Sequence, residues 1–168
     1  MNMMVTGCRP QKLGGYGQVA QDNVLRVARI AISDMKPAKL ISGMALGWDQ
    51  ACALAALELK IPLIAAIPFE GQEKMWPQES QEGYRDLLDC AEKIVNVEDL
   101  DGYRIRSVRL GVYHSQKLQR RNEWMIDNSE GRLIAMWDGN PGGTANCLKD
   151  ARDCARLYRN FFQLLKVQ

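Results

Sequence analysis

Short apolar runs alternate with longer helical patterns along this chain, and that alternation limits its fold more than any other feature. The runs with the composition of β-strands are 3–6, 39–42, 62–67, 93–97 and 133–137. The segments with apolar residues at helical spacing are 24–35, 49–59, 81–91 and 116–128. Strands that alternate with helices form a parallel sheet with helical crossovers. The sequence therefore predicts an α/β fold: a doubly wound, mostly parallel sheet with helices on both faces.

The sequence pattern of the C-terminal tail, from residue 145 onward, is ambiguous. Residues 145–156 have a helical pattern, whereas 161–167 fit either a last strand or the end of a helix. The predicted helix 49–59 is apolar nearly all round, so we expect it to lie buried against the sheet. No repeat, linker or low-complexity stretch divides the chain, and 168 residues can build one core. We expect a single Rossmann-like domain, 1–168.

Composition excludes several classes of protein. The hydrophobic content of 46% rules out a disordered chain, and the longest apolar run, 61–69, is too short to cross a membrane. The N-terminus does not resemble a signal peptide, and the five cysteines have no paired spacing. We therefore expect a cytoplasmic protein with reduced thiols. The single histidine, His114, excludes a His-rich zinc site, and we expect no metal and no cofactor.

Glycines follow three of the predicted strands directly. They are Gly7, Gly43 and the glycines of 139–143. Open α/β sheets bind ligands at the carboxyl ends of their strands, where glycine lets backbone N–H groups approach an anion. The N-terminus of the following helix adds a partial positive charge. We therefore predict a crevice that suits phosphate or ribose, although a tight strand-to-helix turn also explains each glycine singly. Neither the dinucleotide fingerprint nor the P-loop pattern is present.

The residues around these glycines resemble the YpsA-like branch of the SLOG superfamily, which is named after the Smf/DprA proteins and the LOG enzymes. The stretches that carry the resemblance are 6–16, 42–49, 67–72, 119–129 and 137–144, in family order. The superfamily includes hydrolases of nucleoside monophosphates, sensors of cyclic ADP-ribose-type signals and DNA-binding proteins, and it occurs in bacteria and phages. The resemblance implies a Rossmann-like fold that binds a nucleotide-derived ligand at its glycine loops.

Two arginines are the predicted anion-binding side chains, because a guanidinium matches phosphate in a planar, bidentate way. Arg9 follows the first glycine loop, and Arg121 with Met125 resembles part of the Arg-Lys-x-x-Met motif of LOG-type enzymes. The full set of residues that we expect to bind the ligand is Thr6, Gly7, Arg9, Gly43, Gly47, Asp49, Arg121, Gly142, Gly143 and Thr144.

The hydrolase motif of the LOG-type enzymes is incomplete in this chain. Their Pro-Gly-Gly-x-Gly-Thr-x-x-Glu motif resembles 141–149, but Lys149 occupies the position of the acid. Cleavage of an N-glycosidic bond builds positive charge on the ribose, which a lysine cannot stabilise. We therefore expect a sensor or sequestering protein without efficient turnover. As a separate expectation, we predict that the protein forms a homo-oligomer. The alternative is a hydrolase in which Glu70, Asp138 or Glu123 replaces the acid.

A basic segment, 103–121, leaves a second alternative open. It carries five arginines and Lys117, with Tyr103 and Tyr113 interleaved and no acid. This composition suits single-stranded nucleic acid or a polyphosphate tail, but it more often belongs to a solvated loop beside the crevice. Trp48 and Trp76 flank the predicted ligand loops, where either could stack on a base or pack into the core. Cys147 and Cys154 are seven residues apart and are predicted to share an inward helix face.

Overall fold

Six parallel strands form the sheet at the centre of the molecule. The computed structural model describes residues 1–165. The strands are β1 (Asn2–Gly7), β2 (Lys39–Ser42), β3 (Leu63–Ile67), β4 (Lys93–Asn96), β5 (Leu133–Met136) and β6 (Tyr158–Asn160). Their order is β4-β3-β2-β1-β5-β6, and every neighbouring pair is parallel. The predicted α/β fold is confirmed, with a sheet that is wholly rather than mostly parallel.

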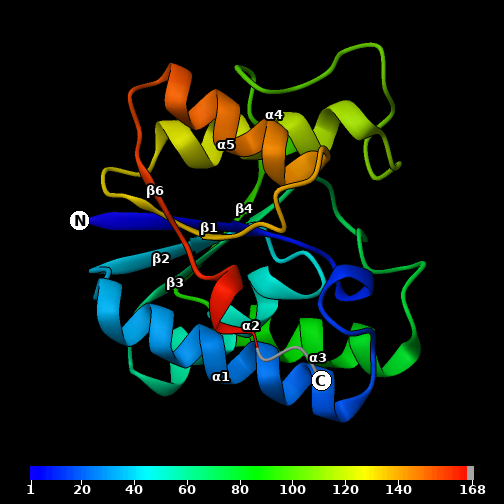
Figure 1. The fold of residues 1–168 in the computed structure, drawn as a ribbon. Coiled ribbons are helices and arrows are strands. Elements are labelled where there is room, and N and C mark those ends of the chain that lie inside the picture. The colour runs from blue at the N-terminus through cyan, green and yellow to red at the C-terminus, as the bar shows by residue number, and fades with distance from the viewer. Residues whose placement is uncertain (166–168) are drawn as a thin grey trace.

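Helices cover both faces of the sheet. The α-helices are α1 (Gln18–Met35), α2 (Trp48–Glu58), α3 (Gln78–Asp89), α4 (Ser115–Asp127) and α5 (Gly143–Asp153). The described residues also form three short 3-10 helices: η1 (Pro10–Lys12) after β1, η2 (Val97–Asp99) after β4 and η3 (Phe162–Leu164) after β6. Helices α1, α2 and α3 lie on one face, and α4 and α5 lie on the other (Figure 1). None of the helices within residues 1–165 is long and apolar enough to span a membrane.

Alternate side chains of the strands enter two separate cores. Val5 and Leu40 pack on the α1–α3 side, whereas Met4 and Ile41 pack on the side of α4 and α5. This alternation is the ordinary consequence of the two-residue period of a strand. The small buried residues of α2, such as Ala53 and Ala56, bring that helix close to its neighbours, as its apolar sequence predicts.

The C-terminal region differs from the sequence prediction at its last strand and at the end of its last helix. The last strand is Tyr158–Asn160, which precedes the predicted range 161–167, and that range extends beyond the described residues. An edge strand that carries Arg159 and Asn160 lacks the apolar run by which the other strands were recognised. Helix α5 ends at Asp153, so Cys154 lies beyond the helix and is exposed, whereas Cys147 is buried.

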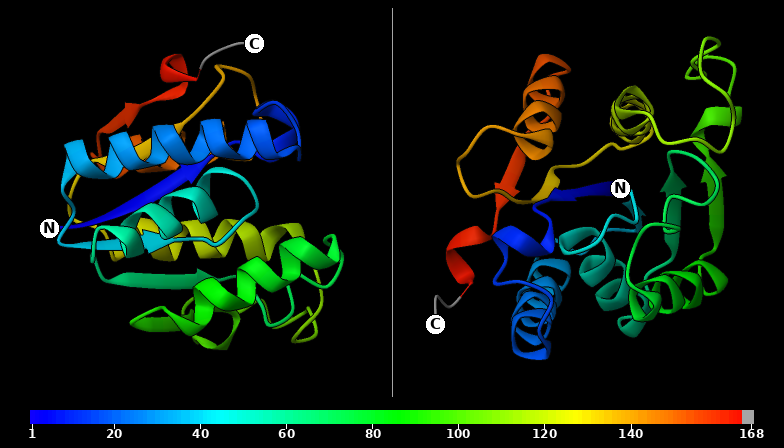
Figure 2. Two further views of the ribbon diagram at one scale, coloured as in Figure 1. Left: turned by 90° about the horizontal axis from the view of Figure 1, so that it is seen from below. Right: turned by 90° about the vertical axis from the view of Figure 1, so that its right-hand side faces the viewer.

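The sheet reverses its direction of growth between β1 and β5. Strands β2, β3 and β4 are added on one side of β1, and β5 and β6 are then added on the other. The right-hand view of Figure 2 shows the two helical layers that result. The loops after β1 and β5 lead to opposite layers and leave space between them at the carboxyl edge. This is the switch point at which open α/β sheets bind ligands.

Candidate functional site

A crevice of about 430 Å³ opens at this switch point. Cavities of roughly 300–1,000 Å³ are typical of small-molecule sites. Its walls come from the loop after β1 with η1, from the loop that joins β5 to α5, from α4 and from the first turn of α2. The lining residues are Thr6, Gly7, Cys8, Arg9, Gln11, Lys12, Ala45, Asp49, Leu118, Arg121, Asn122, Trp137, Asp138, Asn140, Pro141, Gly142, Gly143 and Thr144.

The structure brings eight of the ten residues predicted to bind a ligand to this one crevice. They are Thr6, Gly7, Arg9, Asp49, Arg121, Gly142, Gly143 and Thr144. The other two, Gly43 and Gly47, do not line it. Each of these two glycines instead packs against a residue that lines the crevice: Gly43 against Arg121, and Gly47 against Cys8.

Gly43 makes room for the side chain of Arg121. A Cβ at Gly43 would lie 2.3 Å from Nη1 of Arg121, and that same nitrogen donates a hydrogen bond to the Gly43 carbonyl. Gly47 has a φ of +96°, and a Cβ there would lie 2.7 Å from the carbonyl oxygen of Cys8. Both glycines therefore shape the crevice from behind its wall.

Arg121 and Asp49 place two buried charges in the wall of the crevice. Each residue is only 5% exposed. Burial raises the pKa of Asp49, and the charges of Arg121 and Arg9 oppose that rise. Burial also lowers the pKa of Arg121, with Asp49 acting in the opposite direction. Charged groups that are buried in a cleft and carry shifted pKa values are typical of functional sites.

The first turn of α5 supplies backbone donors to the crevice. The helix follows Gly142, whose φ of 151° favours glycine, and no side chain caps this terminus. The first N–H groups of a helix have no partner inside it, and the helix dipole makes them attractive to an anion. Arg9 and Lys12 line the same crevice. An anionic group in it would therefore meet both backbone donors and cationic side chains.

Asp138 is the second carboxylate in the crevice. It accepts hydrogen bonds from the side chain and the backbone N–H of Asn140, and its Oδ2 lies 3.1 Å from Nζ of Lys12. These contacts, led by the Asn140 side chain, lower the pKa of Asp138 to about 2. At neutral pH the group is therefore a carboxylate that can accept hydrogen bonds from hydroxyl groups but has no proton to donate.

Two thiols lie at the crevice or directly behind it, and both are protonated at neutral pH. Burial raises the pKa of Cys8, which contacts the hydroxyl of Thr144 and the N–H of Asp138. Burial raises the pKa of Cys147 to about 11. Because the thiolate is the nucleophile, neither cysteine is activated for attack. No group of His, Cys, Asp and Glu suited to a metal ion occurs among the described residues.

Two of the three residues proposed as substitute acids lie outside the crevice. Glu70 is exposed on the loop after β3, and Glu123 pairs with Arg120 at 2.8 Å on α4. Neither is a lining residue, and Lys149 is exposed on α5 and does not line the crevice either. Of the three, only Asp138 stands where a ligand in this crevice could meet it.

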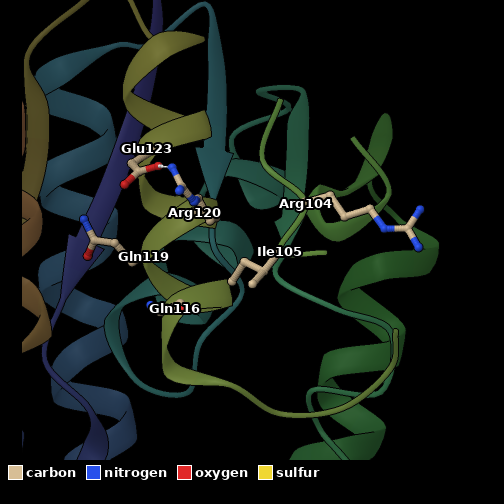
Figure 3. Close-up of a pocket in the computed structure, with 6 residues that line it drawn as sticks. All are labelled: Arg104, Ile105, Gln116, Gln119, Arg120 and Glu123. Carbon is tan, nitrogen blue, oxygen red and sulfur yellow. Dashed lines mark hydrogen bonds and ion pairs between the residues drawn. The ribbon is translucent and has the colours of Figure 1, made fainter. Parts of the chain in front are cut away.

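A second hollow, of about 370 Å³, lies on the other side of α4 (Figure 3). Its lining residues are Arg104, Ile105, Gln116, Gln119, Arg120 and Glu123. Figure 3 shows that the Arg104 side chain extends away from α4, and that Arg120 is engaged with Glu123. The hollow has no glycine and no buried charge in its wall.

The basic segment 103–121 is divided between the interior and the surface. Lys117 is 3% exposed, and its Nζ lies 2.7 Å from Glu98, with further hydrogen bonds to the carbonyls of Arg109 and Val112. Glu98 also accepts the N–H of Gly111. The pair anchors this stretch, so Lys117 and Arg121 do not belong to a basic surface. Sequence analysis missed Glu98 because it lies outside the segment.

The tryptophan at the crevice is Trp137, which the sequence analysis did not select. Trp48 is fully buried, with Cδ1 2.5 Å from where a Cβ on Gly7 would stand, so core packing is its role. Trp76 packs edge-on against Tyr84, with ring centroids 5.3 Å apart. Neither lines the crevice, whereas Trp137 does. Its place directly after a strand and before Asp138 was the available signal.

The sequence of this chain is similar to a family profile and to known proteins. The profile of the YpsA group, described as the YspA SLOG family, matches residues 3–167. The uncharacterized SPbeta prophage-derived protein YoqJ of Bacillus subtilis is 38% identical over 137 residues, which cover 79% of this chain and 80% of YoqJ. A UPF0398 protein of Halalkalibacterium halodurans is 26% identical over 118 residues, which cover 67% of this chain and 57% of that protein.

Two solved structures share the fold. DNA processing protein A (DprA) from Streptococcus pneumoniae matches with a TM-score of 0.64 and 17% identity, over 95% of this chain and 49% of DprA. This chain thus spans about half the length of that protein. The protein TM1055 matches with a TM-score of 0.55 and 12% identity, over 94% of this chain and 71% of TM1055. At these identities the likeness establishes the fold alone.

Proposed function

Because this chain belongs to the YspA SLOG family, we propose that its switch-point crevice binds a nucleotide or an ADP-ribose-type small molecule without efficient turnover. One observation carries the proposal. The uncapped first turn of α5 and three cationic side chains, Arg9, Lys12 and Arg121, meet two carboxylates in a single cavity. The protein would sense such a ligand or sequester it.

The arrangement of charge favours a ligand with an anionic part and a hydroxylated part. The α5 terminus with Arg9 and Arg121 suits phosphate, because charge-assisted hydrogen bonds to phosphate are strong and directional. Asp49 and Asp138 suit ribose hydroxyls, which donate hydrogen bonds to carboxylates. A simple inorganic anion would use only the first set of groups. We therefore expect a nucleotide to bind more tightly than phosphate does.

The proposal of binding without turnover rests on the groups that the crevice lacks. Lys149 stands in place of the motif acid and lies outside the crevice, as do Glu70 and Glu123. Both thiols are protonated, and Asp138 is held as an anion by Asn140 and Lys12. The hydrolase alternative is left with Asp138 as its one candidate from the predicted set. Release of free base from a nucleoside monophosphate at 1 to 1,000 per second, the order typical of enzymes, would establish that alternative instead.

The nucleic-acid alternative rests on the exposed part of the basic segment. Arg104, Arg106 and Arg109 are exposed, and Tyr113 is 66% exposed. These residues lie outside the crevice, and they lack the buried charges and the helix terminus that support the small-molecule proposal. A titration with a single-stranded oligonucleotide distinguishes the two, since a nucleic-acid site would lose affinity steeply with salt.

The experiment that tests the proposed function is a thermal-unfolding titration of the full chain with a panel of nucleotides and ADP-ribose. A ligand at a hundred times its dissociation constant should raise the free energy of unfolding by about 2.7 kcal/mol. Mass spectrometry of whatever co-purifies with the protein would identify the natural ligand, and light scattering would test the proposed homo-oligomer. The absence of any shift at millimolar ligand would overturn the proposal.

A further inference from the structure

Trp137 is held in a fixed orientation at the wall of the crevice. Its backbone N–H donates to Oδ1 of Asn160 at 2.9 Å, and its carbonyl accepts from Nδ2 of the same residue at 2.9 Å. Its indole Nε1 donates to the carbonyl of Asn140 at 2.8 Å. Part of the side chain packs against the core under α4 and α5, and the residue also lines the crevice. The ring is therefore in place before any ligand arrives.

The other tryptophans are not available to a ligand in this crevice. Trp48 is fully buried beneath Gly7, Trp76 packs on Tyr84, and Trp124 is 9% exposed. None of them is a lining residue, and no phenylalanine or tyrosine lines the crevice within the described residues. Trp137 is thus the aromatic side chain that this part of the structure offers to a flat ligand group.

Trp137 and the α5 terminus stand at the two ends of one short loop. Trp137 directly follows β5, and α5 begins at Gly143. Between them Asp138 presents its carboxylate to the same crevice. Along the chain the loop therefore offers an aromatic ring, a hydrogen-bond acceptor and then backbone donors. A nucleotide offers the complementary groups in the same sequence: a base, a ribose and a phosphate.

We propose that Trp137 is the surface on which the base of the ligand stacks, so that the crevice selects phosphorylated ligands that carry a nucleobase. This inference rests on the proposed function and names the part of the ligand that the proposed function leaves open. Stacking on a ring that is already ordered costs little conformational entropy. Because the indole N–H is engaged by Asn140, the ring offers its π-face and no donor. Every base has such a face, so Trp137 distinguishes the presence of a base rather than its identity.

The test compares two probes, AMP and ribose 5-phosphate, by isothermal titration of the full chain. In Trp137→Leu the affinity for AMP should fall by roughly ten- to a hundredfold, the range that loss of base–aromatic stacking produces. The affinity for ribose 5-phosphate should stay within about twofold. Trp137→Phe keeps an aromatic ring and should retain most of the affinity for AMP. Tyr113→Leu is the matched control, because Tyr113 is an exposed aromatic residue outside the crevice.

Fluorescence gives a readout that a purely structural role of Trp137 would not change. Stacking of AMP on the indole should quench part of the tryptophan emission of the wild-type protein, and that quenching should vanish in Trp137→Phe although AMP still binds. An unchanged affinity for AMP in Trp137→Leu would overturn the inference while leaving the proposed function in place. An equal loss for both probes would also overturn it, since Trp137 would then act through the shape of the loop. A wild-type protein that binds neither probe would overturn the proposed function and this inference together.

Discussion

Two adjacent residues of α4, Arg120 and Arg121, face two different cavities. Arg121 lines the switch-point crevice, is 5% exposed, and donates to the carbonyl of Gly43. Arg120 lines the hollow on the other side of the helix. Its side chain is half exposed and forms an ion pair with Glu123. The two residues have the same chemistry and neighbouring positions, and they differ in what surrounds them.

We infer from this difference that burial, rather than the number of arginines, distinguishes the proposed binding site from a charged surface. Exposed ion pairs such as Arg120–Glu123 contribute little to the free energy of folding, because water and salt screen them. A guanidinium held in a protein wall is screened less by water and salt. The guanidinium of Arg121 is also held in place by hydrogen bonds to the Gly43 carbonyl and the Asn122 side chain. The crevice also has a helix terminus and a buried carboxylate, Asp49, which the hollow lacks.

The largest expected effect is on stability and comes from Lys117, one turn before Arg121 on α4. Lys117→Met should lower the free energy of unfolding by about 3–5 kcal/mol, because it leaves Glu98 buried without its partner. Chemical denaturation measures this change. The double variant with Glu98→Leu should recover much of the loss, since no buried charge then remains. A loss below about 0.5 kcal/mol, as expected for the exposed Arg109→Ala, would contradict the structural role of the pair.

The next effect is on affinity. Arg121→Ala should weaken the binding of AMP about ten- to a hundredfold, because a charge-assisted hydrogen bond contributes roughly 1.5–3 kcal/mol. Arg121→Lys should restore only part of the affinity, since it keeps the charge without the planar fork. Arg120→Ala is the matched control and should leave the affinity unchanged. Isothermal titration measures all three, alongside a thermal melt, because Arg121→Ala also leaves Asp49 buried without its neighbouring charge. Equal effects at both positions would remove the distinction between the two cavities.

A smaller effect on affinity is expected from Gly43, which lies behind Arg121 and does not line the crevice. Gly43→Ala places a methyl group against the guanidinium of Arg121, which must move, and overpacking of this kind costs about 1–3 kcal/mol of stability. We expect the affinity for AMP to fall severalfold as Arg121 shifts. Gly83→Ala on α3 is the control, since open space surrounds that position and alanine favours a helix. A Gly43→Ala protein with wild-type affinity would show that Arg121 does not need this orientation.

The smallest effect is a dependence of stability on pH that involves Asp138. Its pKa in the folded protein, about 2, is below the ordinary value of 3.8, so the ionised group stabilises the fold above about pH 4. That contribution is lost as the pH falls from 3.8 toward 2. The difference in unfolding free energy between wild type and Asp138→Asn should therefore be constant near neutral pH and shrink over this interval. Urea denaturation at several pH values measures it, with the exposed Asp101→Asn as control. A difference that persists unchanged at pH 2 would mean that ionisation of Asp138 is not its source.

The succession of strands and helices along the chain was predictable from the sequence because the strands appear as short apolar runs and most helices have apolar residues at helical spacing. Edge strand β6 was missed because its polar Arg159 and Asn160 hide that pattern. The glycine positions predicted where the crevice lies, since they follow strands whose ends meet at one sheet edge, and eight of the ten residues predicted to bind a ligand line it. They could not show that Gly43 leaves space for the Arg121 side chain and accepts a hydrogen bond from it, because that contact joins residues 78 positions apart. Glu98 and Trp137 were missed for related reasons: the burial of Lys117 and the packing of each tryptophan depend on tertiary structure.

The central position of β1 also has a consequence during synthesis. This strand precedes the others in the chain, yet it pairs with β2 on one side and with β5 on the other. The interval from the end of β1 at Gly7 to the start of β5 at Leu133 is 126 residues. At about 5–20 residues per second, a ribosome takes roughly 6–25 seconds to cover it. For that time β1 has no partner strand available on its β5 side. Only when residues 133–144 have been made can the two walls of the crevice meet, so any binding at the crevice must wait for this late stage of synthesis.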